Sequence, residues 1–321
     1  MVTSRMLELT CICHILLVSA ASLSLSSTDY GDKKLHIVYA GSLPGGNYSP
    51  ESHHLDILQS FLTENFEPGR SLYRRYGRSF NSFAAWLTER EQEKLSKRNE
   101  ILSVFPSQPL QLHTTRSWDF MGLTESDMII GVLDSGIWPE SESFSVQFRK
   151  SGRALVKIVG ARWYVGQPGA RDVVGHGTHT APIAAGNRVK GASFYNLAGG
   201  TARGGVPSSR IAVYVACCRA ADLLAGFDDA IADGVDVITI SIGYAHPVSS
   251  LLEDPISIGS FHAMANNIVT VNSAGNSGPD GAPIVILSPW VVSVGASTTD
   301  RKFDDNVVLA DGRTLTGISV N

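Results

Sequence analysis

Several features of other protein classes are scarce or missing in this chain. Lys, Arg, Asp and Glu make up 17% of its 321 residues, and the net charge is −4 with no basic block. This charge pattern disfavours nucleic acid as a partner. The glycine-rich run GGTARGG has no lysine and forms no phosphate-binding loop, which weakens a nucleotide-binding interpretation. No EF-hand-like ligand spacing occurs either, so we predict no metal site and no cofactor.

Cysteine is also rare. The chain has four, and two of them, Cys11 and Cys13, lie in an apolar run near the N-terminus. The other two, Cys217 and Cys218, are adjacent, and adjacent cysteines rarely bridge each other. The sequence therefore predicts no disulfide framework.

The N-terminus has the pattern of a cleavable secretory signal. Arg5 precedes the apolar run LTCICHILLVSAA, which ends in small residues at Ala21 and is followed by a polar stretch. The run is too short for a comfortable membrane span, although a membrane anchor or a buried helix is the alternative. We expect residues 1–21 to be a signal peptide and the protein to be secreted, with no stable membrane span. The sequon Asn47-Tyr48-Ser49 is compatible with export and predicts glycosylation of Asn47.

Residues 34–113 alternate between short strands and helices. The run HIVYA is β-branched and aromatic, and residues 53–66 place leucines and phenylalanine on one helical face. Residues 71–87 indicate two strands with a turn at Gly77. Thr88 and Glu91 have the spacing of a capping box for a second helix, and ILSVFP closes the unit as a strand. The order β-α-β-β-α-β predicts a small ferredoxin-like α+β domain with no catalytic cluster of its own.

The pattern of apolar residues changes after Thr114. The runs MIIGVLDSG, RIAVYVACC, VDVITISIG, NIVTVNSAG and WVVSVGAS are largely continuous in apolar residues, and helix-like segments lie between them. Strands buried on both faces that alternate with helices predict a parallel sheet in an α/β domain. Ligands bind at the carboxyl ends of the strands in such sheets. Here those ends carry Asp134, Ser241, Asn272 and Asn276.

Three polar residues in separate loops can take chemical roles. Asp134 follows a buried strand, where backbone N–H groups can hold a carboxylate that orients an imidazole; an ordinary Asx turn is the alternative. His176 lies between Gly175 and Gly177 at the start of a helix, where both glycines leave room for approach, and imidazole titrates near neutral pH as a general base does. A histidine merely tolerated in a glycine turn is the alternative. The Asn276 amide can donate to a developing oxyanion, or it merely tolerates a left-handed backbone.

A second histidine, His179, follows His176 by three residues. A zinc pair is one interpretation, but metal-binding helices normally use i, i+4 spacing with an adjacent glutamate. We therefore interpret His179 as a packed helix residue. Pro182 falls early in the same helix, and proline in a first turn does not break a helix.

Taken together, these motifs resemble those of the subtilisin-like serine proteases, and most of all the secreted plant subtilases. The resemblance runs from Lys34 to the end of the chain and rests on the stretches DSGIWPESESF, GHGTHTA, ARGGVPSSRIAVY, FDDAIADGVDVITISIG and NSAGNSGP. It implies a serine endopeptidase that is made as a proprotein and acts on polypeptides. It also implies that Asp134 is the orienting carboxylate, His176 the general base and Asn276 the oxyanion donor.

The same resemblance divides the chain. Residues 34–113 resemble the family's inhibitory propeptide domain, which implies binding to its own or a related protease domain, and residues 114–321 resemble the peptidase domain. LHTTRSWDFMGL resembles the processing junction, which would fall between His113 and Thr114. The expected location is the extracellular space or cell wall. The expected fold is α/β: a parallel-sheet subtilisin-like domain, incomplete, preceded by a small ferredoxin-like α+β propeptide domain.

One residue that the resemblance implies is missing. The family's nucleophilic serine stands in a GTSMA stretch, and no GTS occurs in the 321 residues. The last residues resemble the point where plant members enter an inserted protease-associated domain. We therefore expect the peptidase domain to be C-terminally truncated and inactive as it stands. The alternative is a non-catalytic protein whose propeptide domain binds or regulates a related protease.

Overall fold

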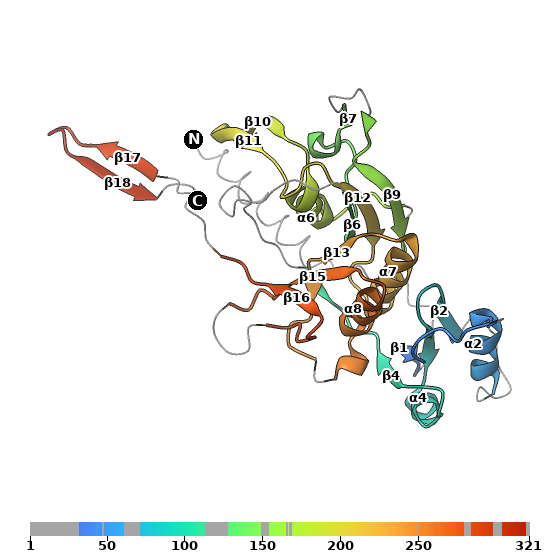
Figure 1. Cartoon of the computed structure of the whole chain (residues 1–321). Coiled ribbons are helices and arrows are strands. Elements are labelled where there is room, and N and C mark those ends of the chain that lie inside the picture. Colours follow the sequence, from blue (N-terminus) through green and yellow to red (C-terminus); the bar gives the residue numbers. More distant parts are fainter. Residues whose placement is uncertain are drawn as a thin grey trace, which may run out of the picture.

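The computed structural model describes residues 32–46, 48–60, 71–112, 128–148, 154–164, 166, 169–248, 250–278, 284–297 and 304–318. The predicted signal peptide, Asn47, His113 and Thr114 lie outside these residues. Figure 1 shows a small leading domain beside a larger domain built on a central sheet. Within the described residues, no helix combines the length and apolarity needed to cross a membrane.

The leading domain is an antiparallel sheet with two helices. Its elements are β1 (Lys34–Tyr39), α2 (Pro50–Gln59), β2 (Leu72–Tyr76), β3 (Ser82–Leu87), α4 (Glu89–Ser96) and β4 (Ser103–Pro106). The strands lie in the order β2-β3-β1-β4 with antiparallel pairing, which confirms the ferredoxin-like arrangement. The predicted capping box between Thr88 and Glu91 starts α4. One core of this domain lies between the helices and the sheet and includes Ile57, Leu58, Phe83, Leu87 and Leu95.

The larger domain is built on a six-stranded sheet in which every neighbouring pair is parallel. In spatial order its strands are β16 (Val291–Val294), β15 (Val269–Ser273), β13 (Val237–Ile240), β6 (Ile129–Asp134), β12 (Arg210–Val215) and β9 (Ile158–Trp163). Five of these strands lie in the apolar runs of the sequence, which confirms the parallel-sheet prediction. Because neighbouring strands run the same way, β6, β13 and β15 all end at one edge of the sheet.

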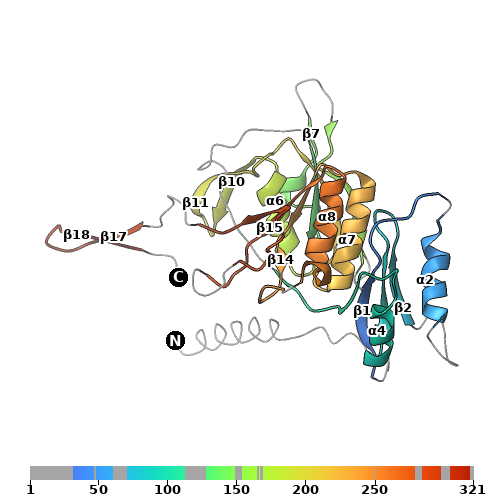
Figure 2. The same cartoon turned by 60° about the horizontal axis from the view of Figure 1, so that its bottom comes forward.

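Helices cover both faces of this sheet. Ala181 and Ala185 of α6 (His176–Ala185) pack on one face against Val132 and Val213. The other face packs, through Leu133, against α7 (Ala220–Asp233) and α8 (Pro255–Ala265). Figure 2 shows α7 and α8 side by side, with the leading domain on their outer side. The two helices are therefore the layer between the central sheet and the leading domain.

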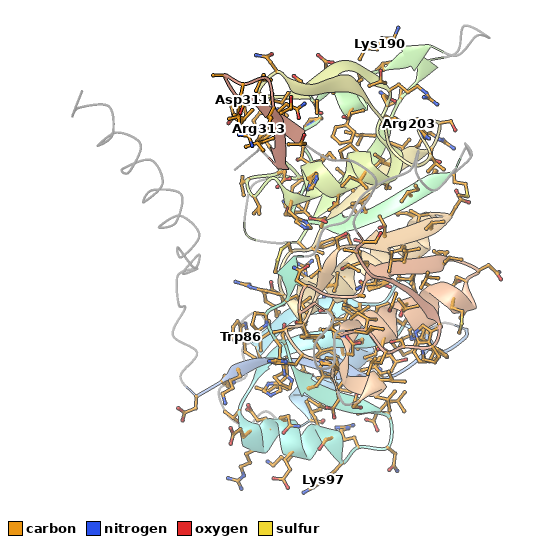
Figure 3. All side chains as sticks on the ribbon, turned by 90° about the vertical axis from the view of Figure 1, so that its left-hand side faces the viewer. Trp86, Lys97, Lys190, Arg203, Asp311 and Arg313 are labelled. Carbon is orange, nitrogen blue, oxygen red and sulfur yellow. A yellow bond between two sulfur atoms is a disulfide. The ribbon has the colours of Figure 1, made fainter. Side chains whose placement is uncertain are left out.

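The remaining elements are short or lie apart from the central sheet. They are the pairs β5 (Gln111–Leu112) with β14 (Ile242–Gly243), β7 (Gln147–Phe148) with β8 (Ala154–Leu155), β10 (Val189–Phe194) with β11 (Leu197–Ala202) and β17 (Asp304–Val308) with β18 (Thr314–Ile318), and the 3-10 turns η1 (Glu142–Phe144) and η2 (Leu251–Glu253). The β17–β18 hairpin projects away from the larger domain (Figure 1). Asp311 and Arg313 pair in its turn at 2.8 Å (Figure 3).

Two local predictions were wrong. Pro182 lies inside α6, in its second turn and not its first, since the helix begins at His176. Proline there cannot donate to the carbonyl of Thr178, yet the helix continues to Ala185. Cys217 and Cys218 are joined by a disulfide, whereas the sequence predicted no bridge between them.

Candidate active site

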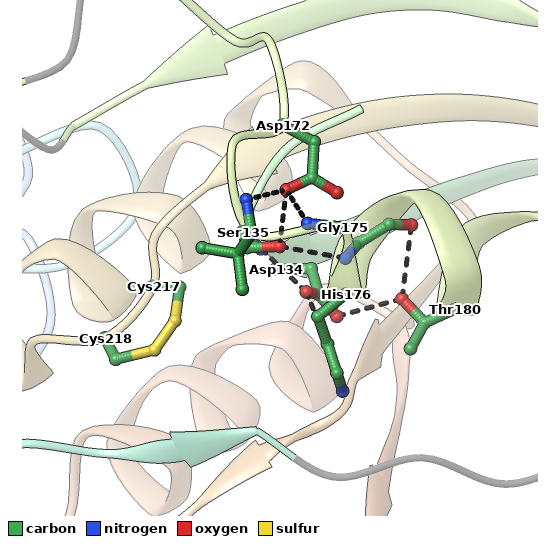
Figure 4. Close-up of a disulfide and its surroundings, with 10 residues drawn as sticks. Asp134, Ser135, Asp172, Gly175, His176, Thr180, Cys217 and Cys218 are labelled. Carbon is green, nitrogen blue, oxygen red and sulfur yellow. Dashed lines mark hydrogen bonds and ion pairs between the residues drawn. A yellow bond between two sulfur atoms is a disulfide. The ribbon is translucent and has the colours of Figure 1, made fainter. Parts of the chain in front are cut away.

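The end of β6 and the start of α6 bring Asp134 and His176 together. Oδ1 of Asp134 lies 2.7 Å from Nδ1 of His176. The Ser135 backbone N–H donates to the same oxygen at 2.7 Å, and the Thr180 hydroxyl donates to Oδ2 at 2.9 Å. Asp134 is 1% exposed. Donors on both oxygens fix the orientation of this buried carboxylate, and the carboxylate in turn fixes the imidazole ring (Figure 4).

The same hydrogen bond selects a tautomer of His176. A carboxylate only accepts hydrogen bonds, so Nδ1 of the ring carries the proton that it donates to Asp134. Nε2 of the neutral ring then carries the lone pair. A histidine in this state can accept a proton at Nε2 while the carboxylate stabilises the imidazolium that results.

The glycines around His176 are explained by close packing of two backbones. A Cβ on Gly177 would lie 2.2 Å from the carbonyl oxygen of Gly136, in the loop that follows Asp134. Gly175 caps the helix with a φ of +91°, a left-handed conformation that favours glycine. The sequence interpretation, that both glycines leave room for approach to the histidine, is therefore incomplete: Gly177 lets the two loops touch.

Sequence reasoning missed Asp172, a third residue that organises the site. Its Oδ1 accepts from the Ser135 hydroxyl at 3.0 Å and from the backbone N–H of Gly175 at 2.8 Å. Its Oδ2 accepts from both the backbone N–H and the hydroxyl of Thr178, at 2.8 and 2.7 Å. Asp172 thus ties the loop after β6 to the first turn of α6 (Figure 4).

The ionisation of Asp172 reflects two opposing effects. Its burial favours the neutral carboxyl, but the hydrogen bonds from Thr178, Gly175 and Val174 outweigh burial and hold the pKa below its usual value. The local sequence signal was an aspartate three residues before a left-handed glycine. That pattern is common in loops and does not by itself single out a residue.

The other polar residues at strand ends differ in burial. Asn276 is exposed in the loop that follows β15, so it emerges at the same sheet edge as Asp134. Asn272 is buried, and its amide donates to the backbone carbonyls of Ile242 and Ser273 at 3.3 and 2.8 Å, so it serves the fold. Ser241 is half-buried between β13 and β14.

His179 is exposed on α6, so its interpretation as a packed helix histidine was wrong. A helix residue three positions after His176 lies on a similar side, but α6 leaves this part of its surface to solvent. Among the described residues, no group of three or more His, Cys, Asp and Glu side chains is arranged to hold a metal ion.

The chain just before the predicted processing junction lies extended at the same edge of the sheet. Gln111 and Leu112 form β5, which pairs antiparallel with β14, Leu112 opposite Ile242 and Gln111 opposite Gly243. β14 follows the carboxyl end of β13 after one residue, Ser241. An extended segment added to a strand in this way is a common mode of peptide binding.

Two family models match the chain. The model of the subtilase family, peptidase S8, matches residues 125–316, and the model of peptidase inhibitor I9 matches residues 36–113. The first covers the central sheet with Asp134 and His176, and the second covers the ferredoxin-like domain.

Curated relatives of this chain include subtilisin-like proteases of the plant Arabidopsis thaliana. Subtilisin-like protease SBT4.3 of Arabidopsis thaliana is 52% identical over 325 residues, which covers 92% of this chain and 44% of the relative. Subtilisin-like protease SBT4.11 of the same plant is 52% identical over 320 residues and covers 90% of this chain and 43% of the relative. The chain therefore spans less than half the length of these relatives.

Solved structures of low identity share the fold. Two crystal structures of the epidermin leader peptide processing serine protease of Staphylococcus aureus, one of them a mutant, match with TM-scores of 0.53 and 0.52. Their sequences are 13% and 14% identical to this chain, and each match covers 78% of this chain and 62% of the bacterial one. At this identity the match bears on the fold alone.

Proposed function

Because this chain belongs to the subtilase family and carries an inhibitor I9 domain ahead of its peptidase domain, we propose that it provides the general base of a secreted serine endopeptidase made as a proprotein. The observation that carries the proposal is the 2.7 Å hydrogen bond from His176 Nδ1 to a carboxylate, Asp134, that is 1% exposed. A buried, oriented carboxylate on one ring nitrogen leaves the other as the proton acceptor that acyl transfer needs.

In the proposed reaction, Nε2 of His176 takes the proton of a serine hydroxyl as its oxygen attacks the peptide carbonyl. Asp134 stabilises the imidazolium, which then gives its proton to the leaving amine. The Asn276 amide donates a hydrogen bond to the oxyanion of the tetrahedral intermediate. The exposure of Asn276 at the sheet edge of Asp134 is compatible with this role.

The motif that holds the family's nucleophilic serine is absent from these residues. No GTS stretch occurs in the 321 residues, so we propose that a polypeptide of these residues alone hydrolyses no peptide bond. The match of the leading domain to the peptidase inhibitor I9 model supports a second candidate function. In that function the chain binds or regulates a related protease through its leading domain.

The proposed division of the chain is a signal peptide at residues 1–21, a propeptide domain at 34–113 and a peptidase domain at 114–321. Processing would fall between His113 and Thr114. The antiparallel pairing of Gln111 and Leu112 with β14 supports this, because it holds the preceding residues extended as a bound peptide would be. The signal pattern of residues 1–21 supports export to the extracellular space or cell wall, with glycosylation at Asn47.

A chimera tests the general base. Residues 1–321 are joined to the remaining C-terminal part of SBT4.3 and expressed in a secretory host. We expect the chimera to be cut at the His113–Thr114 junction and to hydrolyse a peptide substrate. His176→Ala should abolish both, while His179→Ala, an exposed histidine on the same helix, should leave both intact. Normal junction cleavage in the His176→Ala chimera would overturn the role of His176.

A further inference from the structure

The leading domain contacts α7 through the turn between β2 and β3. Tyr76 and Phe80 flank this turn, and both are fully buried. The Tyr76 hydroxyl donates to the backbone carbonyl of Ala221 in α7 at 2.7 Å. Between these two aromatic residues lie Gly77, Arg78 and Ser79, which we name the clamp loop.

The clamp loop encloses the carboxylate of Asp228. The backbone N–H groups of all three loop residues donate to it, Gly77 at 3.1 Å, Arg78 at 3.1 Å and Ser79 at 2.5 Å. The Ser79 hydroxyl donates to the Asp228 backbone carbonyl at 2.9 Å. Asp228 is 4% exposed. Its bonds to the loop offset part of the hydration that burial removes, although burial still raises the pKa of this carboxyl.

Packing leaves the clamp loop little freedom. A Cβ on Gly77 would lie 2.7 Å from Cβ of Pro50, the first residue of α2. The loop therefore passes between α2 on one side and Asp228 on the other. Three amides held in this way form a preformed receptor for one carboxylate.

Arg78 adds a charge to the contact. Its guanidinium binds Asp229 and also Asp233, the latter at 3.1 Å. The peptidase domain contributes one arginine of its own to these carboxylates, Arg162 of β9, which forms two bonds of 2.8 Å with Asp233. Arg162 also lies 3.9 Å from Asp229, so Arg78 of the leading domain brings a second positive charge to the same two carboxylates.

The Arg78 ion pairs and the buried Asp228 carboxylate discriminate between partners in different ways. Exposed ion pairs such as those of Arg78, whose side chain is 43% exposed, add little affinity but disfavour partners of the wrong charge. The buried Asp228 is more demanding, because the loop N–H groups donate to both of its oxygens. Asparagine there would keep one acceptor oxygen and turn an NH2 donor toward the loop, and an apolar residue would leave the loop N–H groups buried without acceptors. A partner that lacks the carboxylate of Asp228, or those that pair with Arg78, leaves polar or charged groups of the clamp loop without partners. This loss of pairing, and not a loss of apolar contact area, disfavours such a partner.

We propose that Asp228, Asp229 and Asp233 form a recognition site for the clamp loop, and that this site determines which propeptide domain a peptidase domain accepts, within one chain or between two. The partner that the leading domain fits is a subtilase domain whose corresponding helix carries the pattern D-D-x-x-x-D. The inference rests on the proposed function for the inhibitory role of the leading domain, and not on the chemistry of His176.

A nicked form of the full chain tests the site. A recognition sequence for an unrelated site-specific protease is placed within residues 114–127, the purified chain is cut there, and the dissociation rate of the two pieces is measured at low and high salt. Arg78→Glu should speed dissociation about tenfold at low salt, and less at high salt. Asp228→Asn should speed it about a hundredfold at both.

Matched variants separate recognition from a general loss of charge. Arg75→Glu makes the same charge change in the same strand region, but Arg75 pairs with Glu51 inside the leading domain, so its rate should stay within about twofold of the wild type. In a chain with Asp229→Asn and Asp233→Asn, Arg78→Glu should lose most of its effect. Arg78 is half-exposed, so its replacement tests the site even if Asp228→Asn does not fold.

Equal dissociation of the Arg78→Glu, Asp228→Asn and Arg75→Glu forms would overturn the proposal and leave the apolar contacts of Tyr76 and Phe80 as the whole basis of association. The measurement involves no peptide hydrolysis. A failure here therefore leaves the role of His176 untouched, and an inactive His176 would not alter the dissociation rates.

Discussion

The hydroxyl of Tyr39 lies 2.8 Å from Nε2 of His262, and this contact joins the first strand of the leading domain to α8. The His262 ring stacks on Phe80 with centroids 5.0 Å apart and is 4% exposed. Burial lowers its pKa to about 4. A neutral histidine is therefore built into the interface, and its protonation works against docking of the leading domain.

The first prediction concerns acid stability. The folded pKa of His262 lies below its unfolded value of 6.5, so the unfolded chain binds more protons between about pH 6.5 and 4. The contribution of His262 to stability is then complete above pH 6.5 and falls by about 3 kcal/mol as the pH drops to about 4. His262→Gln should lower stability at pH 7 but flatten this dependence.

The measurement is the free energy of unfolding in urea at a series of pH values. Tyr39→Phe is the control, because it removes the hydroxyl and keeps the histidine. Among other buried histidines, His54 has a pKa lowered by burial to about 4, so part of the wild-type slope should persist in His262→Gln. Identical slopes in wild type and His262→Gln would contradict the prediction.

The second prediction concerns Asp172 as a positioning residue. The two carboxylate oxygens of Asp172 accept hydrogen bonds from Ser135, Gly175 and Thr178. Asparagine in its place has only one acceptor oxygen, and its NH2 group faces these donors. Asp172→Asn should cost about 1–3 kcal/mol of unfolding free energy. It should also shift or broaden the proton resonance of His176 Nδ1, because the first turn of α6 loses its tie to the loop of Asp134.

The control for Asp172 is Glu140→Gln. Glu140 forms a bidentate pair with Arg171, the residue before Asp172, but it is exposed. Its loss should change the unfolding free energy much less than Asp172→Asn does, because solvent screens an exposed pair, and it should leave the His176 resonance in place. A His176 resonance unchanged in Asp172→Asn would show that Asp172 only stabilises the fold.

The third prediction separates packing from access at the glycines. Gly177→Ala places a methyl group against the Gly136 carbonyl, so the start of α6 must move and the hydrogen bond between Asp134 and His176 should weaken or break. Gly175→Asn should be mild, since no atom lies within 4 Å of a Cβ at Gly175 and asparagine tolerates a left-handed backbone. The Nδ1 proton resonance reports both, and equal effects would contradict the packing explanation.

Much of the fold was readable from the sequence because strands buried on both faces leave continuous apolar runs. β9 was not predicted from the apolar pattern, because it is an edge strand whose residues from Val159 to Trp163 are exposed. The β10–β11 and β17–β18 hairpins were not predicted for the same reason, because little of either is buried. Burial, and not strand formation itself, is what the apolar pattern records.

The site was readable where a residue type limits the chemistry, and unreadable where only contacts across the chain matter. Asp134 and His176 stood out through their strand-end and glycine contexts. The role of Gly177 depends on Gly136, far away in sequence. Asp172 accepts hydrogen bonds from Gly175 and Thr178 nearby, a pattern common in loops, but its link to the loop of Asp134 depends on Ser135, 37 residues earlier.

The last prediction concerns Asp222, at the start of α7. It is fully buried, its Oδ1 accepts from the Tyr73 hydroxyl at 3.0 Å and lies 3.5 Å from Arg74, and among the described residues its Oδ2 has no hydrogen-bond partner. Burial outweighs Arg74 and Tyr73 and raises its pKa to about 6. The folded chain then binds more protons than the unfolded one between about pH 3.8 and 6, so this group lowers stability as the pH rises through that window.

Asp222→Asn keeps the shape of the neutral acid and removes the ionisation. The variant should match the wild type near pH 4 and exceed it at pH 7 by about 2–3 kcal/mol of unfolding free energy. Tyr73→Phe keeps the carboxyl but removes a donor to it, so it should be less stable than the wild type at pH 7. An Asp222→Asn chain that is less stable than the wild type at pH 7 would mean that the ion pair with Arg74 outweighs the burial of the carboxylate.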